Sequence, residues 1–165
     1  MHLNIASVVT IFFLSWSSIA ASQTWVNTIG SPEGIAIQGY DSVAFFTEKK
    51  AVSGSKEYSV EWAGATWLFS TQENLALFKQ DPDKWSPQYG GHCSYGISEG
   101  YISKKPTSGQ FALRDDKLYL FPKGTKTQTG AYDGWWQSGG GPSYRIAEGA
   151  KKWPQLKASL EVTEK

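Results

Sequence analysis

The chain of 165 residues contains a single cysteine, Cys93. One cysteine cannot form a disulfide within the chain. A structural zinc site of four cysteines, or of two cysteines and two histidines, is equally excluded. The fold must therefore be held together by its own apolar core. The residues for such a core are present, because 40% of the chain is hydrophobic and 15% is aromatic. This length and composition predict one ordered domain.

The charges are balanced, with 16 Lys and Arg residues against 15 Asp and Glu residues and a formal net charge of +1. Such a balance provides no field that would attract nucleic acid or an anionic membrane surface. We therefore expect no nucleic-acid partner.

The first twenty residues have the pattern of a secretory signal peptide. Residues 1–20 contain no Asp, Glu, Lys or Arg, and their apolar stretch is followed by small residues. Ser18 and Ala20 fit the −3 and −1 positions of a cleavage signal, so we predict a cut after Ala20, with Ser22 as the second choice. An uncleaved signal anchor is the alternative. No later window approaches eighteen apolar residues, which predicts a periplasmic or secreted protein without stable membrane insertion after cleavage.

Hydrophobic patterning predicts two antiparallel hairpins. Residues 58–62 and 66–69 are aromatic and β-branched runs separated by an Ala-Gly-Ala segment. Residues 110–114 and 117–121 alternate around a pair of aspartates, which is typical of a second hairpin. Residues 35–37 are a further short strand candidate.

A capping box predicts the first helix. Ser70 is placed as its N-cap and Glu73 at the third helical position. Leu75 and Phe78 would form the buried stripe of this helix, and Pro82 would end it.

The remaining segments complete a single small α+β domain with two or three helices. Residues 92–100 fit either a loop or a short helix, and residues 143–152 fit a final helix ended by a Trp-Pro pair. This α+β domain would cover residues 35–160. A mobile leader over 21–34 would precede it, and a glycine-rich loop insertion would occupy 122–142.

The residues argue against common enzyme chemistry. Signal cleavage leaves His92 as the only imidazole, so any serine or cysteine triad would need it as the base. Neighbouring side chains diverge in strands and helices, which separates His92 from Cys93. The segment around them lacks the G-x-S-x-G spacing, and no phosphate-binding loop is present. We therefore favour a non-enzymatic protein.

His92 and Cys93 supply the nitrogen and sulfur donors that copper and zinc prefer. Two donors are too few for a closed structural zinc site. Both side chains can meet one ion only if the backbone turns sharply, which Gly90, Gly91 and Gly96 permit. From these residues alone, a buried thiol beside a hydrogen-bonded histidine is the favoured interpretation. The alternative is a soft-metal site at Cys93 and His92, with copper as the first choice.

Two further functions stay open. Aromatic side chains can form a binding module for a small molecule or a glycan, and adjacent tryptophans in a loop either make a stacking platform or cover the core. A redox role through Cys93 and an intermolecular disulfide is the other alternative. The candidate ligand residues of the binding module are Tyr40, Asp41, Tyr89, Tyr95, Trp135 and Trp136.

Three blocks resemble the exported bacterial YHS domain-containing proteins. Residues 39–46 read GYDSVAFF, residues 67–74 read WLFSTQEN and residues 87–94 read PQYGGHCS. They are similar to the GYDPVAYF-type opening, the W-x-F-S-S-x-E-N block and the PQYGGYCA-type signature of that family, in the same order. The family resemblance implies metal binding, which has been inferred chiefly from cysteine-rich members. This chain lacks their paired cysteines, so the resemblance extends to Cys93 and to His92, which stands where an aromatic residue is usual.

Overall fold

A computed structural model describes residues 24–107, 109–123, 131–137 and 139–161. The signal peptide predicted for residues 1–20 lies outside these ranges. The described residues form six α-helices, three short 3₁₀ turns and two antiparallel hairpins, which confirms the small single-domain α+β fold and adds helices to the two or three expected. The 3₁₀ turns are η1 (Pro32–Gly34), η2 (Ala36–Gly39) and η3 (Gln88–Gly91). The helices are α1 (Ser42–Thr47), α2 (Gln72–Gln80), α3 (Pro82–Trp85), α4 (Ser94–Glu99), α5 (Ala131–Gln137) and α6 (Gly141–Glu161).

Both predicted hairpins are confirmed. β1 (Ser55–Trp62) pairs with β2 (Ala65–Phe69), and β3 (Gln110–Arg114) pairs with β4 (Lys117–Phe121). The second hairpin has the predicted bounds. Residues 35–37 do not form a strand: Ile35 makes one isolated bridge to Thr66, and the chain then turns through η2.

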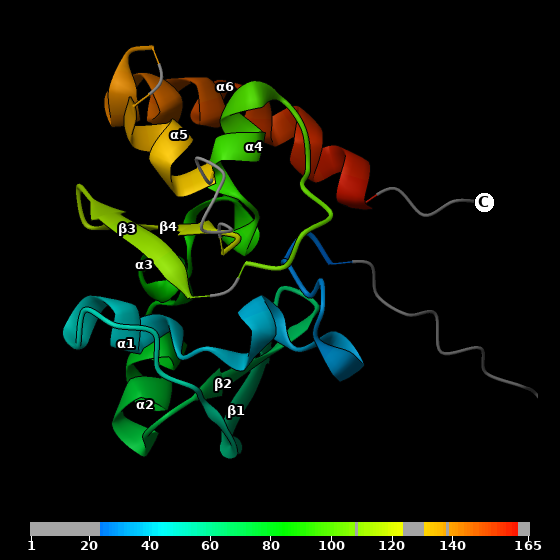
Figure 1. Ribbon diagram of the computed structural model, residues 1–165. Coiled ribbons are helices and arrows are strands. Elements are labelled where there is room, and N and C mark those ends of the chain that lie inside the picture. Colours follow the sequence, from blue (N-terminus) through cyan, green and yellow to red (C-terminus); the bar gives the residue numbers. More distant parts are fainter. Residues whose placement is uncertain (1–23, 108, 124–130, 138, 162–165) are drawn as a thin grey trace, which may run out of the picture.

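The hairpin β3–β4 separates two apolar clusters. Leu118 and Leu120 of β4 point into a first cluster with β2, α1 and α2, whereas Tyr119 and Phe121 point into a second cluster with α4, α5 and α6. This is the period of two that a strand imposes on its side chains. In Figure 1 the hairpin accordingly lies between β1, β2, α1 and α2 below and α4, α5 and α6 above.

The first cluster is tied together by the buried carboxylate of Asp41. Its Oδ1 accepts the backbone N–H groups of Val43 and Ala44 at 2.9 and 3.1 Å, which caps α1. Its Oδ2 accepts the N–H and hydroxyl of Ser70 at 2.8 and 2.6 Å and the amide of Asn74 at 2.7 Å. The predicted cap of α2 is therefore wrong by one residue. Ser70 is bonded to Asp41, and Thr71 caps the helix instead by accepting the N–H of Asn74 at 3.1 Å.

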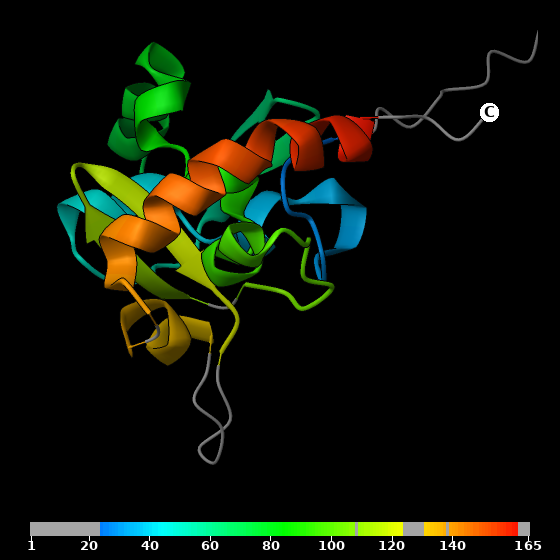
Figure 2. The ribbon, with the colours of Figure 1, turned by 90° about the horizontal axis from the view of Figure 1, so that it is seen from above.

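Helix α6 covers the second cluster, as Figure 2 shows from above. It is longer than the predicted segment 143–152, and Pro154 lies inside it. A proline inside a helix costs about 3 kcal/mol. The helix continues because Trp153 and Leu156, on either side of Pro154, both pack against the second cluster.

Two other predicted segments differ in the structure. The glycine-rich insertion 122–142 contains α5, and the fully buried Trp135 anchors that helix in the second cluster. The predicted leader 21–34 is packed over residues 24–29, where Val26 and Asn27 are each only 2% exposed. No helix in the described ranges is both long and apolar enough to cross a membrane.

The close approach of α6 to η3 depends on Gly149. A Cβ at this position would lie 2.4 Å from the hydroxyl oxygen of Tyr89, which is 7% exposed and donates to the carbonyl of Ile146 at 3.3 Å. Alanine normally stabilises a helix by about 1 kcal/mol over glycine. Here the added methyl group must displace either α6 or the Tyr89 ring.

We expect Gly149→Ala to lower the free energy of unfolding by about 1–3 kcal/mol, the usual cost of overpacking. Urea unfolding followed by tryptophan fluorescence measures this change. Gly139→Ala is the control, because a Cβ at residue 139 meets nothing within 4 Å. Equal stabilities of the two variants would contradict the packing argument.

Candidate functional site

The predicted donor pair follows a strongly curved turn. Tyr89, Gly90 and Gly91 of η3 all have positive φ, at 57°, 61° and 81°. The backbone is then extended at His92, Cys93 has φ −55° and ψ 109°, and α4 begins at Ser94. Cys93 also makes an isolated parallel bridge with Leu120, which places the start of α4 beside β4.

His92 lies between the N-terminal segment and α6. Its Nε2 is 3.2 Å from the backbone oxygen of Trp25, and its ring centroid is 6.1 Å from that of Trp153. Burial lowers the pKa of His92 to about 4, so the ring is neutral at pH 7. A neutral ring that bonds a carbonyl must carry its proton on Nε2, which leaves Nδ1 as an acceptor. No described side chain or backbone group is hydrogen-bonded to this buried Nδ1.

Cys93 is the N-cap of α4. Its Sγ accepts the backbone N–H of Gly96 at 3.5 Å, and the residue is 3% exposed. Burial raises the pKa of the thiol, whereas the N–H groups of Gly96 and Tyr95 and the ammonium group of Lys105 counteract that rise. The thiol is therefore protonated at rest, but groups that stabilise a thiolate surround it.

The two predicted donors do not share surroundings. Successive side chains of an extended backbone point to opposite sides. His92 contacts Trp25 and Trp153, while Cys93 lies near Tyr95 and Tyr101. Within the described ranges, no three His, Cys, Asp or Glu side chains gather closely enough to hold a metal ion.

Two phenols accompany the thiol. The pKa of Tyr101 is raised by burial and, to a lesser extent, by its proximity to Cys93 and Tyr95. The Tyr101 ring packs so closely on α4 that a Cβ at Gly96 would lie 3.1 Å from it. Tyr101 is 50% exposed, whereas Cys93 is buried.

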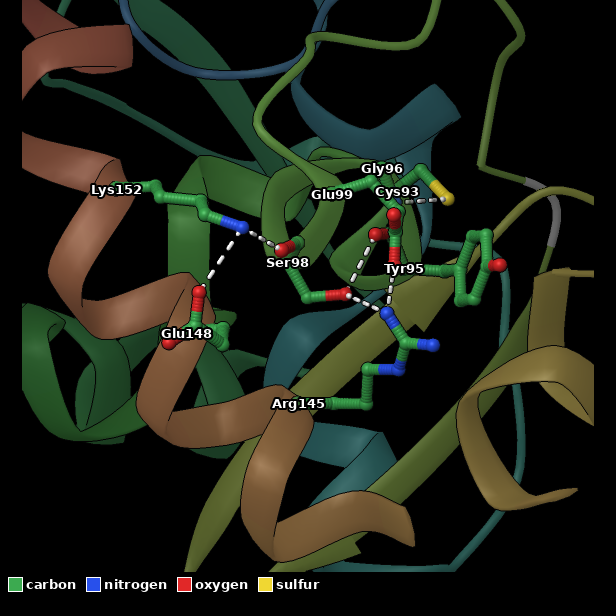
Figure 3. Close-up of polar contacts among 8 residues, drawn as sticks. All are labelled: Cys93, Tyr95, Gly96, Ser98, Glu99, Arg145, Glu148 and Lys152. Atoms are coloured by element: carbon green, nitrogen blue, oxygen red, sulfur yellow. Dashed lines mark hydrogen bonds and ion pairs between the residues drawn. The ribbon is translucent and has the colours of Figure 1, made fainter. Parts of the chain in front are cut away.

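Polar contacts from α6 fix the other end of α4 (Figure 3). Arg145 pairs with Glu99, and its guanidinium group lies 4.8 Å from the centre of the Tyr95 ring. Lys152 donates to the backbone oxygen of Ser98 at 2.6 Å. Cations at the carboxyl end of a helix are electrostatically favourable. They hold the short helix that positions Cys93 at its amino end.

The other candidate ligand residues are dispersed. Asp41 is fully buried and its oxygens accept five hydrogen bonds, and Tyr89 is packed beneath α6. Trp135 is fully buried and Trp136 is 37% exposed, so the adjacent pair does not form an open platform. Tyr40 packs against the first cluster and Tyr95 against the second.

Sequence reasoning missed four residues around the predicted pair: Trp25, Asn27, Tyr101 and Thr107. Asn27 is the most informative of them, because its amide donates both to the backbone oxygen of Gly91 at 3.0 Å and to the Thr107 hydroxyl at 3.2 Å. The apolar residues Trp25 and Val26 were the available signal that this segment is packed. No short-range pattern could have connected it to residue 91 or 107.

Comparisons with protein-family models, with curated proteins and with solved structures found no match to this chain.

Burial of His92 makes stability depend on pH. The unfolded chain binds a proton at a pKa near 6.5, whereas folded His92 binds one only near 4, so this group stabilises the fold above pH 6.5 and its contribution is lost as the pH falls toward 4. The two values correspond to about 3 kcal/mol. We expect the wild-type protein to lose about that much more stability than His92→Gln between pH 7 and 4.

Urea unfolding of both proteins across this range gives the difference, and carboxylates common to both cancel. Parallel pH profiles would show that His92 is not a buried neutral ring.

Proposed function

We propose that this chain is an exported YHS-type domain that binds a soft metal ion, Cu(I) in the first place, through the thiolate of Cys93. The observation that carries the proposal is the position of the only thiol. Cys93 caps α4, with its sulfur accepting the backbone N–H of Gly96 at 3.5 Å, and the charge of Lys105 lowers the pKa of the thiol. The resemblance of residues 39–46, 67–74 and 87–94 to the YHS family supports the assignment, and the pattern of residues 1–20 supports export.

The electrostatics favour a metal thiolate over a free thiolate. A buried anion is costly, which raises the pKa of Cys93. A bound cation neutralises that charge, and the N–H of Gly96 still bonds the sulfur. Thiolate is the protein ligand that selects Cu(I), whereas the nearby phenol oxygens are weaker ligands for this ion.

The divergence of His92 from Cys93 argues for a site with one strong protein donor. An ion held in this way keeps coordination positions for a ligand that does not come from this chain. Such an open sphere suits an ion that is passed on, because structural ions are enclosed by four protein ligands. We therefore assign a handling role rather than a structural one.

The test is a Cu(I) titration against a chromogenic competitor under anaerobic conditions. Cys93→Ser should lower the affinity at least about 100-fold, equivalent to about 2.7 kcal/mol. Serine is a preferred N-cap, so this variant retains the start of α4 and unfolding would not cause the loss. His92→Gln is the matched neighbour and should change the affinity by less than about threefold, since its ring faces Trp25 and Trp153.

A second measurement follows the thiol proton. Because binding displaces it, the affinity should rise about tenfold per pH unit between pH 6 and 8. Unchanged affinity in Cys93→Ser would refute metal binding through Cys93. An equal loss in both variants would instead place the ion between the two residues.

A further inference from the structure

The N-terminal segment bonds to the chain on both sides of Cys93. We call residues 24–27 the N-terminal strap. Val26 and Asn27 of this strap are 2% exposed. Thr24 ties its beginning to the first hairpin by donating to the carbonyl of Ala63 at 2.6 Å. A segment without helix or strand is thus held by buried side chains and by a hydrogen bond to the first hairpin.

Asn27 bonds the turn that precedes Cys93. Its backbone N–H donates to the oxygen of Gly90 at 2.8 Å, and its side-chain amide donates to the oxygen of Gly91 at 3.0 Å. The fit is close, because a Cβ at Gly90 would lie 2.5 Å from the backbone oxygen of Trp25. The strap therefore covers η3 directly, two residues before the thiol.

The same amide bonds the segment that follows α4. The second donor hydrogen of Asn27 reaches the hydroxyl of Thr107 at 3.2 Å, and Thr107 in turn donates to the oxygen of Gly91 at 3.0 Å. Thr107 ends the stretch that carries Tyr101, whose ring packs on α4 at Gly96, and Lys105, whose charge lowers the pKa of Cys93. The buried side-chain amide of Asn27 thus bonds one residue before Cys93 in the sequence and one residue after it.

Trp25 anchors the strap to the two halves of the molecule. Its ring lies 5.6 Å from Trp62 of β1 and 6.3 Å from Trp153 of α6, and Lys157 lies 4.1 Å above it. Its backbone oxygen lies 3.2 Å from Nε2 of His92. The ring itself is half-buried and packs against the first cluster from outside its buried residues, so its removal weakens the strap while those buried residues remain.

We propose that the N-terminal strap controls access to Cys93: in place, it holds η3 and the 101–107 segment together around the thiol, and when it opens, the thiol becomes reactive. Opening is a local transition, because it breaks the hydrogen bonds of one short segment and withdraws only Val26 and Trp25 from the first cluster, while the other residues of both clusters stay packed. The claim that the strap regulates metal uptake rests on the proposed function. The claim that the strap limits the reactivity of the Cys93 thiol is independent of it.

Thiol reactivity tests the strap without any metal. Cys93 is the only cysteine, so the rate of reaction with an aromatic disulfide reagent under native conditions reports this site alone. Asn27→Ala removes the two hydrogen bonds that the side-chain amide donates to Gly91 and Thr107. Trp25→Ala removes the ring that anchors the strap and serves as the second variant in case Asn27→Ala folds poorly. Each should accelerate the reaction at least about tenfold beyond what its global unfolding equilibrium supplies.

The controls are matched by residue type. Asn74→Ala removes a buried amide that bonds Asp41. Trp85→Ala removes a half-buried ring that lies 4.5 Å from a lysine, as Trp25 does at 4.1 Å. Both controls should expose Cys93 only through global unfolding. If all four variants follow one line of rate against unfolding free energy, the strap does not control the thiol.

Cu(I) uptake separates this inference from the proposed function. Faster uptake by Trp25→Ala with an unchanged affinity supports both. A faster thiol reaction without Cu(I) binding upholds the strap and refutes the metal site. If the strap variants bind Cu(I) but react with the thiol reagent and take up Cu(I) at the wild-type rates, the metal site is upheld and control by the strap is refuted.

Discussion

The hydrogen bonds of Asn27 join parts of the chain that no regular element connects. Its carbonyl accepts the N–H of Ile37 at 2.8 Å, its N–H and amide bond the oxygens of Gly90 and Gly91, and its Oδ1 accepts the N–H of Ile29 at 2.9 Å. Each of these groups belongs to a turn, where backbone polar groups have no ladder to satisfy them. A buried polar group left without its partner costs about 1–3 kcal/mol. One residue of the N-terminal strap, through its backbone and its side chain, thus satisfies groups in two turns that are far apart in the sequence.

Those two turns share an unusual backbone. Residues 37–39 and 89–91 each run through three positive φ values, and a Cβ at Gly91 would lie 2.4 Å from the Ile37 side chain, so the turns pack against each other. A β-branched residue such as Ile37, at φ 43°, is strained there. Such conformations persist only where surrounding contacts determine them. The shared contacts with Asn27 and the packing of the turns explain why they coexist.

The sequence predicts the hairpins well because strands carry a local signal. The alternation in β3 and β4 places Leu118 and Leu120 on one face and Tyr119 on the other, and a pattern of period two records this directly. The predicted helix ends are wrong where a contact with a residue distant in the sequence determines the structure. Ser70 does not cap α2 because Asp41, 29 residues earlier, binds it. Pro154 does not end α6 because packing against the second cluster outweighs local propensity.

At the candidate site, too, local features can be predicted from the sequence and contacts with distant residues cannot. The sequence shows that His92 and Cys93 are adjacent, and neighbouring side chains are expected to diverge. It does not show which residues surround each of them. Trp25 comes from the strap, Trp153 from α6 and Tyr101 from beyond α4. The strained turn lies immediately before the one thiol, and strain of this kind gathers at functional sites. Because Asn27 holds this turn, the proposed control of access would act on Cys93 through the backbone immediately before it.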